Sequence, residues 1–511
     1  MNMKNILKYF GLLILALSMT ECELDVIPQD ALTSEQITTT SDGLSSLVNG
    51  FYAILMEADG NNCYIRQYYQ MSDFASDDIV CAYKTEDDLI NSFRFKDRAA
   101  EKSNINAFWE SSYKIVYGAN VAISMADIKG DDPSTNQLKG ESYFMRAFAT
   151  HNLVRFFAKP YSEANKMEPG VIIRLSKADN MPKARATLEE TYNYITGSLR
   201  TAESLMSEEM PADRNNDNHR FASIYSVWAM LSRVYLYKGE LDSCILYSDK
   251  LINSGAFTLE TPESYPEFFA NAKNGSESIW LVPFNPIDDQ LNGSVASMIY
   301  NGNNCWAEEG ASVSILDDMG SGTAMVDIDQ RWKYIVTDAG VVKNGVNMFY
   351  ISKFSGQDGS PTLSSPVMFR LAEVYLNRAE AYAKKGDVAS AVADLNEILV
   401  NRLIVPEGEV IDDYLYNEGT ITSDEIVDVV LKERRIELAF EGHRIFDLLR
   451  NGKDIVRNYW GFHLDVYNGI PTGAEPGMDA GGVLFHSSDP WVIYPIPSSE
   501  ISTNKLCIPN E

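Results

Sequence analysis

The stretch YLYKGELDSCILYSDKLI, residues Tyr235–Ile252, decides the fold, because a second stretch repeats its pattern. The stretch YAKKGDVASAVADLNEI, residues Tyr382–Ile398, aligns with it and places Gly386 opposite Gly239. Each contains the end of one amphipathic helix, a Lys-Gly-acidic turn and a second amphipathic helix. Glycine ends the first helix, and small residues allow the paired helices to approach each other. This pattern is typical of the helix–turn–helix unit of a tetratricopeptide repeat.

Two earlier parts of the chain have a weaker form of the same pattern. The helical stretch 140–157 is expected to pair with the stretch 188–205, and the stretch 41–56 with the stretch 108–127. Long insertions separate these units, which is unusual for a regular solenoid. We therefore predict a mainly α fold in which tetratricopeptide-like helix pairs form a scaffold.

The insertions differ from the helices in composition. Residues near 57–107 and 254–365 are rich in Gly, Asn, Asp, Ser and aromatic side chains. SIWLVPF (Ser278–Phe284) has the pattern of a short strand, and VIYPIPSSEIS (Val492–Ser502) that of a short strand followed by turns. We predict a loop-rich, irregular subregion with short strands, and long ordered loops on a rigid frame commonly carry binding sites.

The overall charge excludes one class of partner. The chain has 511 residues, 45% of them hydrophobic, and a formal net charge of −29. Nucleic acid is not an expected partner, because a phosphate backbone requires clustered Lys and Arg and the sequence has no long basic run.

The N-terminus has the pattern of a targeting segment. Two lysines precede the apolar run Phe10–Met19, which is short for crossing a bilayer, and Cys22 follows it. We expect residues 1–21 to be a lipoprotein signal peptide, Cys22 to carry the lipid, and residues 22–511 to form one domain. The usual small residue directly before the cysteine is absent, so an ordinary secretory signal cleaved nearby is the alternative.

The remaining cysteines do not form a disulfide framework, since an odd number is scattered along the chain. They are Cys63, Cys81, Cys244, Cys305 and Cys507. A bridge between Cys63 and Cys81 is open to test, whereas free buried thiols are the preferred interpretation.

The segment IELAFEGHRIFDLLR, residues 436–450, places carboxylates beside a histidine and two arginines. On a continuous helix, Glu437 lies one turn from Glu441, Arg434 precedes Glu437 by three residues, and Arg444 follows Glu441 by three. A glycosidase needs two carboxylates that face each other across a cleft, whereas these lie along one helix face. We interpret the segment as a packed wall in which every ion has a partner.

Other signs of chemistry are missing from the sequence. No GxSxG, HExxH, Walker or dinucleotide motif is present, and the five histidines have no metal-ligand spacing. We expect no enzymatic activity and no cofactor, with a structural calcium ion left open.

Two stretches, CYIRQYYQMSD and IYNGNNCWAEEG, mix aromatic with polar side chains. A sugar ring packs its apolar C–H face on an aromatic plane, while Asn, Asp and Arg hydrogen-bond its hydroxyls. The alternative is that these aromatics only fix loops to the scaffold. The predicted ligand-binding residues are Arg66, Tyr68, Tyr69 and Tyr83 in and just after the first stretch, and Tyr300, Asn301, Asn304 and Trp306 in the second.

Together and in this order, these features resemble the SusD/RagB family of Bacteroidetes outer-membrane lipoproteins. The resemblance covers nearly the whole mature chain and is most specific in ERRIELAFEGHRIFDLLRNGK (Glu433–Lys453) and YPIPSSEISTN (Tyr494–Asn504). It extends to SLVNGFYAIL (Ser46–Leu55), FWESSYKIVYGAN (Phe108–Asn120) and RAFATHNLVRFFAKPY (Arg146–Tyr161).

The resemblance implies a cell-surface protein, lipid-anchored to the outer membrane through Cys22. Such a protein captures an oligosaccharide or polysaccharide and delivers it to a SusC-like TonB-dependent transporter. Peptide uptake within the same family is the alternative, and a surface hydrolase is a third hypothesis. A flat aromatic platform favours glycan, whereas a groove lined by carboxamide clamps favours peptide.

Overall fold

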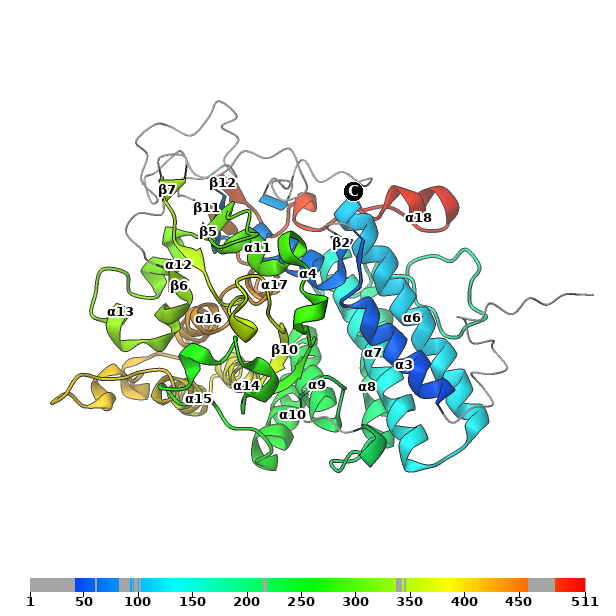
Figure 1. Cartoon of the computed structure of the whole chain (residues 1–511), viewed down its shortest axis with the longest axis horizontal. Coiled ribbons are helices and arrows are strands. Elements are labelled where there is room, and N and C mark those ends of the chain that lie inside the picture. Colours follow the sequence, from blue (N-terminus) through cyan, green and yellow to red (C-terminus); the bar gives the residue numbers. More distant parts are fainter. Residues whose placement is uncertain are drawn as a thin grey trace, which may run out of the picture.

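The computed structural model describes residues 42–59, 62–81, 92–93, 95, 100, 103–214, 218–336, 342–343, 346–457 and 483–510 (Figure 1). The predicted signal peptide, Cys22 and Tyr83 lie outside these ranges. Within them, no helix combines the length and the hydropathy that crossing a bilayer requires.

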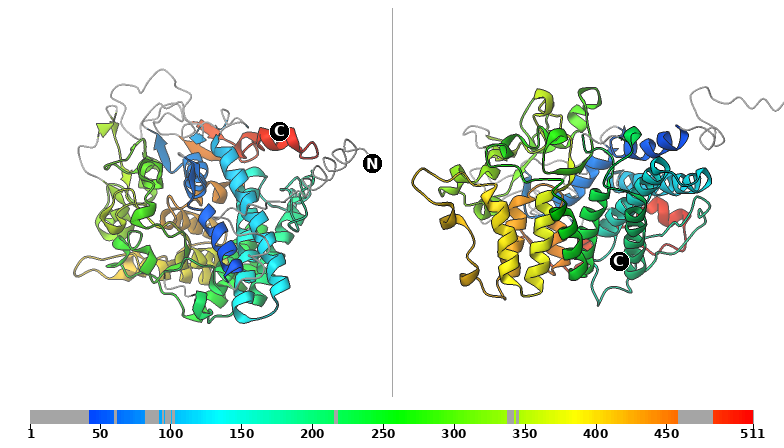
Figure 2. Two further views of the ribbon diagram at one scale, coloured as in Figure 1. Left: turned by 45° about the vertical axis from the view of Figure 1, so that its right-hand side comes forward. Right: turned by 90° about the horizontal axis from the view of Figure 1, so that it is seen from below.

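Long helices form the scaffold, and neighbours along the chain pack against one another. Seen from below in Figure 2, they lie side by side from the cyan helices at one end to the yellow ones at the other. They are α3 (Gly43–Ile54), α6 (Ser103–Lys129), α7 (Pro133–Phe157), α8 (Leu188–Leu205), α9 (Ile224–Lys238), α10 (Leu241–Ser254), α14 (Leu371–Lys384) and α15 (Val388–Val400). The predicted mainly α scaffold is confirmed.

The predicted helix pairs are present. Helix α9 packs on α10, α14 on α15, α7 on α8, and α3 on α6. The two repeated turns depend on glycine, because Gly239 and Gly386 both have a φ of 78°, which other residues rarely adopt. Small side chains allow α9 and α10 to approach, since the hydroxyl oxygens of Ser232 and Ser248 lie 2.8 Å apart.

The insertions and the C-terminal part of the chain contain short strands, which pair as two-stranded antiparallel ladders in the described residues. The pairs are β1 (Ala58–Asp59) with β2 (Asn62–Cys63), β3 (Ile79–Cys81) with β5 (Glu309–Ala311), β4 (Ser278–Leu281) with β10 (Val367–Arg370), β6 (Ile335–Val336) with β9 (Tyr350–Ile351), β7 (Val342–Lys343) with β8 (Val346–Asn347), and β11 (Ile455–Arg457) with β12 (Val483–Phe485). Short helices α11 (Val295–Ile299), α12 (Val313–Asp318) and α13 (Met325–Ile328) lie between them. The predicted loop-rich subregion and the strand at SIWL are confirmed.

Two local predictions are wrong. The expected loop before α6 contains a buried helix, α4 (Tyr64–Ser72). The expected strand at VIYPIPSSEIS is absent, because Pro495 and Pro497 have no N–H for a ladder. The Tyr494 N–H donates to the carbonyl of Phe156 instead (2.8 Å), and helix α18 (Ser498–Thr503) follows.

All five cysteines among the described residues are free thiols. Cys63 and Cys81 are not bridged, and both are buried. The preferred interpretation of these two residues is therefore confirmed.

The expected continuous helix over 436–450 is broken into two. Helix α16 (Ile426–Glu437) ends at Glu437, and α17 (Arg444–Arg450) begins after a turn. Within this turn Phe440 has a φ of 67° and Gly442 a φ of 77°. A Cβ at Gly442 would overlap the Tyr68 ring, so the turn requires glycine for close packing as well as for its backbone conformation.

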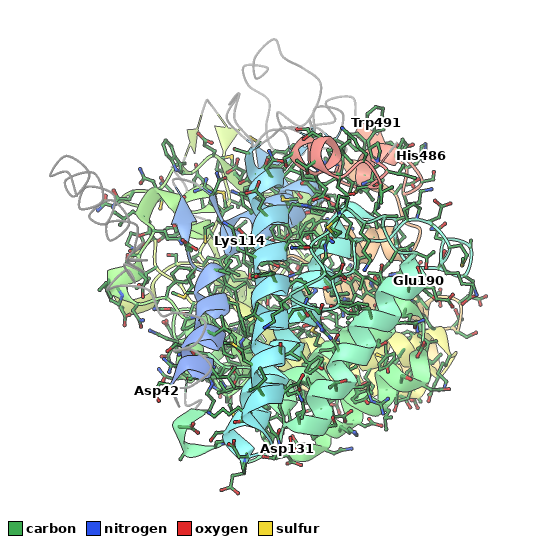
Figure 3. All side chains as sticks on the ribbon, turned by 90° about the vertical axis from the view of Figure 1, so that its right-hand side faces the viewer. Asp42, Lys114, Asp131, Glu190, His486 and Trp491 are labelled. Atoms are coloured by element: carbon green, nitrogen blue, oxygen red, sulfur yellow. The ribbon has the colours of Figure 1, made fainter. Side chains whose placement is uncertain are left out.

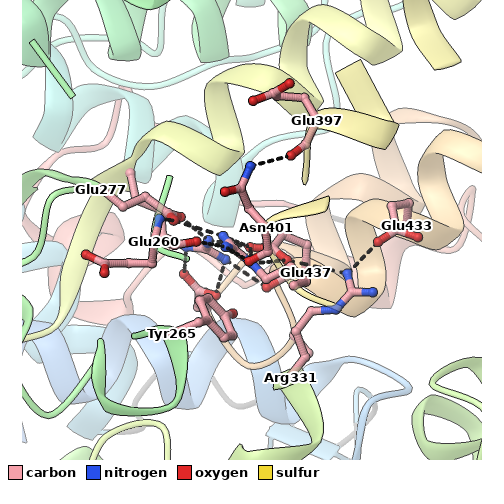
Figure 4. Close-up of polar contacts among 12 residues, drawn as sticks. Glu260, Tyr265, Glu277, Arg331, Glu397, Asn401, Glu433 and Glu437 are labelled. Carbon is pink, nitrogen blue, oxygen red and sulfur yellow. Dashed lines mark hydrogen bonds and ion pairs between the residues drawn. The ribbon is translucent and has the colours of Figure 1, made fainter. Parts of the chain in front are cut away.

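The turn positions the carboxylates of a buried ion network, shown in Figure 4 around Glu437. Arg370 Nη1 lies 2.6 Å from Glu437 Oε1, and Arg402 Nη2 lies 2.9 Å from the same oxygen. Glu441 pairs with Arg370 Nε at 2.8 Å and with Lys353 Nζ at 2.6 Å. The five side chains are buried; Arg370 lies at the end of β10 and Glu437 at the end of α16, while the other three lie in turns or loops.

The pairing predicted within the 436–450 segment is wrong in its partners. Arg434 pairs with Asp447 at 2.7 Å, and Arg444 pairs with Asp77 at 2.7 Å. The reason is the break after Glu437, which turns Glu441 and Arg444 away from the helix face expected for them. The interpretation of the segment as a wall of paired ions is nevertheless confirmed, because these charged side chains are buried or nearly so and each has an oppositely charged partner.

We predict that Glu437→Gln lowers the free energy of unfolding by about 3–5 kcal/mol, because it leaves buried guanidinium groups with too little negative charge. Urea denaturation followed by circular dichroism measures this change. Lys453→Ala is the control, since Lys453 pairs with Asp428 at the surface (2.6 Å). Its removal is expected to change stability by about 0.5 kcal/mol or less. Equal effects of the two substitutions would contradict the prediction.

Candidate functional site

The buried ion network does not have the properties of an active site. Burial raises the pKa of the Glu437 carboxyl, but the guanidinium groups of Arg402 and Arg370 outweigh burial and hold this pKa well below its usual range. Glu437 is therefore ionised at neutral pH and enclosed by cations, so it has neither a proton to donate nor access to a substrate. Among the described residues, no group of three His, Cys, Asp or Glu side chains is arranged to hold a metal ion.

His443, the histidine in the same segment, is also enclosed. Burial lowers the pKa of its imidazole well below 6.5, and the neighbouring charges of Arg233 and Arg434 lower it further. The ring is neutral in the folded protein near neutral pH and is buried among other side chains. It is therefore a packed core residue without access to a substrate.

Trp306 differs from these residues because it is at the surface in a loop with a fixed conformation. The loop runs from α11 to β5, and 45% of the Trp306 surface is exposed. The indole Nε1–H donates to the carbonyl of Asn292 (2.9 Å), and the Trp306 backbone N–H donates to the carbonyl of Ser297 (2.6 Å). The ring is therefore oriented before any ligand arrives.

The residues around Trp306 supply hydrogen-bonding groups. Asn301 and Asn304 are exposed, and Tyr300 is half-buried. Asn304 has a φ of 63°, a conformation that asparagine tolerates better than most residues. Gly302 permits the tight loop, since a Cβ there would lie 2.9 Å from Pro361 Cβ. We call Tyr300, Asn301, Asn304 and Trp306 the Trp306 platform.

The structure changes the interpretation of the predicted site residues on α4, whereas Tyr83 lies outside the described residues. Tyr68 and Tyr69 are each 1% exposed, because α4 packs against α6 and the core. The Tyr69 ring centroid lies 4.6 Å from that of Phe354, and Tyr68 contacts Phe156 edge-on at 6.0 Å. These two rings have no free face for a sugar, so they are not ligand-binding residues.

Arg66 is also buried on α4, but it contributes to the platform indirectly. Its Nη1 donates to the carbonyl of Asn292 (2.9 Å), the same oxygen that accepts from Trp306 Nε1 and from the Ser297 hydroxyl (2.7 Å). Arg66 is 4% exposed and therefore holds the loop beneath Trp306 from within the fold. The alternative interpretation, in which the aromatic side chains of this stretch serve packing, fits Tyr68 and Tyr69.

A second hollow at the surface was not predicted. Trp109, Tyr113 and Tyr117 line a cavity of about 500 Å³ beside α6. They are spaced four residues apart, so they lie on one face of the helix. The four-residue spacing is visible in the sequence. Because Trp109 stands at a core position of the helix, the sequence indicated packing rather than a binding surface.

Comparisons with known proteins agree with this architecture. Residues 276–510 match the model of the SusD family, and residues 24–236 match a second model described as starch-binding associating with outer membrane. SusD-like protein P38 of Formosa agariphila is 25% identical, over 88% of this chain and 92% of its own. SusD-like protein P2 of the same organism is 24% identical, over 98% of each chain.

Solved structures show the same fold. A SusD superfamily protein from Bacteroides thetaiotaomicron superposes with a TM-score of 0.76 at 25% identity, covering 92% of this chain and 99% of that one. A SusD superfamily protein from Bacteroides vulgatus gives a TM-score of 0.73 at 25% identity, covering 91% and 98%. The fold is thus that of a helical, repeat-based binding-protein scaffold. The chain belongs to the SusD/RagB family.

We predict that stability falls as the pH drops from 7 to 5, in part through His443. Below about pH 6.5 the unfolded chain takes up a proton that the buried imidazole does not bind, which costs roughly 1 kcal/mol per pH unit. Replacing this residue, as His443→Gln, is expected to reduce the slope of unfolding free energy against pH by that amount. Urea denaturation at pH 7, 6 and 5 measures both slopes, and identical slopes would exclude this role.

Proposed function

We propose that this chain is a glycan-binding lipoprotein of the SusD/RagB family. It captures an oligosaccharide or polysaccharide at the Trp306 platform and delivers it to a SusC-like TonB-dependent transporter. Lipid on Cys22 tethers it to the outer membrane, on the cell surface. It performs no covalent chemistry and requires no cofactor.

The observation that carries this proposal is the exposed, pre-oriented indole of Trp306 beside exposed asparagine side chains. The indole face can pack against the C–H face of a sugar ring, and the amides can bond its hydroxyls. Because the Asn292 carbonyl already holds the ring, little conformational entropy is lost on binding.

Further support comes from the family and from the buried acid–base groups. One of the two matching family models is described as starch-binding and associating with outer membrane. The carboxylates of the 436–450 segment, which are the residues that a hydrolase hypothesis would use, are enclosed in an ion network. An open platform gives modest affinity, in the range of about micromolar to millimolar, because much of the ligand stays hydrated.

The test is affinity electrophoresis of residues 23–511 through gels that contain soluble starch, xylan, arabinogalactan or mucin glycans. Trp306→Ala is expected to weaken binding of the retarding glycan by at least about tenfold, equivalent to about 1.4 kcal/mol. Trp491→Ala is the matched control, because Trp491 is 47% exposed at a different place in the chain and its loss is expected to change nothing.

Two outcomes oppose the proposal in different ways. Chromatography of the bound glycan would reveal shortened products if the protein were a hydrolase. Retardation by no glycan, together with binding of a peptide mixture in isothermal titration, would instead favour peptide cargo.

A further inference from the structure

A groove of about 500 Å³ lies beside the middle of α6, next to the loop after Ile172 and to α18. Figure 3 faces this side of the molecule, with Lys114 labelled on α6 and α18 above it. The volume is within the range of about 300–1,000 Å³ that is typical of small-ligand sites. None of the residues lining the groove belongs to the Trp306 platform.

The wall that α6 contributes is a row of three aromatic side chains. Trp109 is buried, Tyr113 is half-buried, and Tyr117 is 58% exposed. The centroids of the Trp109 and Tyr113 rings are 5.0 Å apart. Tyr117 has no hydrogen-bond or ring-stacking partner within the part of the chain that the structure describes. The row therefore ends in an open aromatic ring at the groove.

The opposite wall is held rigidly against α6. The Tyr113 hydroxyl donates to the carbonyl of Ile172 (3.0 Å) and accepts from its N–H (3.1 Å). Asn120 Nδ2 donates to the carbonyl of Arg174 (2.9 Å), and Tyr194 donates to the same oxygen (2.8 Å). These bonds join the loop to α6 and α8, so the groove exists before a ligand binds.

Interactions of Asp179 within the loop that follows Ile172 fix the shape of this loop. Asp179 accepts from the Leu175 N–H (3.0 Å) and pairs with Lys183 (2.9 Å). The carboxylate of Asp179 is thus already used, and it does not need a ligand to satisfy it.

The charge of the lining disfavours a strongly anionic ligand. Three acidic and two basic side chains line the groove: Glu110, Asp179, Glu500, Lys114 and Arg174. Glu110 and Lys114 are spaced i, i+4 on the exposed face of α6, yet they form no ion pair with each other. Both signs are therefore available at the rim, together with the amide of Asn180.

This combination matches a neutral molecule with many hydroxyl groups. Carboxylates accept hydrogen bonds, an ammonium donates them, and an amide does both. An apolar ligand would cover the exposed side chains of Glu110, Lys114 and Asn180 without bonding to them, which is unfavourable. A sugar ring satisfies them while one face packs on an aromatic ring.

We propose that this groove is a second carbohydrate-binding site, which holds a short neutral saccharide against Tyr117. The proposal rests on the proposed function, since it assumes that the protein's ligand is a glycan. Two sites on one chain can engage one polysaccharide together, so they strengthen binding to a polymer more than to a short oligosaccharide.

The test compares wild type, Trp306→Ala, Tyr117→Ala and the double variant on soluble starch, and on the other panel polysaccharides if starch does not retard the wild type. Tyr117→Ala is expected to weaken binding to the retarding polymer by at least tenfold. Trp306→Ala is expected to keep residual binding, which the double variant loses. Isothermal titration with a short oligosaccharide of the same glycan is expected to give two sites in the wild type and one in each single variant.

Ile128→Ala is the matched control, because Ile128 is an exposed residue of α6 outside the groove. Both α6 variants should keep the wild-type melting temperature. If Tyr117→Ala binds like the wild type while Trp306→Ala abolishes binding, the groove proposal is overturned and the proposed function stands. If no glycan retards the wild type, both proposals are overturned.

Discussion

Compensation of buried charge is the constraint on which this structure depends. In the described residues, the cations of Arg331, Lys353, Arg370 and Arg402 meet the carboxylates of Glu277, Asp329, Glu433, Glu437 and Glu441. Such a network adds little net stability compared with apolar packing, but any arrangement that separates its members is costly. It therefore selects one arrangement of the scaffold helices and the irregular insertion.

Helix α4 connects this core to the surface. Its Tyr68 packs against Gly442, in the turn that positions Glu441, and its Arg66 donates to the carbonyl that orients Trp306. The sequence indicated a ligand-binding loop at this position. The structure instead has a helix that contacts both the ion network and the Trp306 platform. Both contacts are made by one short, buried helix. The loop that carries Trp306 is therefore held in a fixed position relative to the core.

The Trp306 platform and the groove on α6 share one structural feature. In each, an aromatic side chain donates to a backbone carbonyl: Trp306 donates to Asn292, and Tyr113 donates to Ile172. These bonds hold the neighbouring loop in place beside the open aromatic face. Exposed aromatic rings are ordinary when they occur singly. Here a fixed indole with neighbouring amides, and a tyrosine at the end of an aromatic row beside a cavity, give each surface a shape that a sugar ring can match.

The sequence by itself determined the helix pairs and the loop-rich insertions. Gly239 and Gly386 mark the repeated turns because their backbone conformation is local, and the helical spacing of apolar residues is local as well. It also indicated an exposed Trp306, since that residue falls outside any amphipathic pattern.

Only the tertiary structure decided which aromatics are available and which ions pair. Tyr68 and Tyr69 have polar neighbours in sequence, but α6 and the core cover them; Tyr117 continues a row that begins at a core position, yet it is exposed. Glu437 was expected to pair within its own helix, but its partners Arg370 and Arg402 are distant in the chain. The burial and the ion pairing of a side chain depend on contacts with residues that are distant in the sequence. The residues next to it in the sequence do not contain that information.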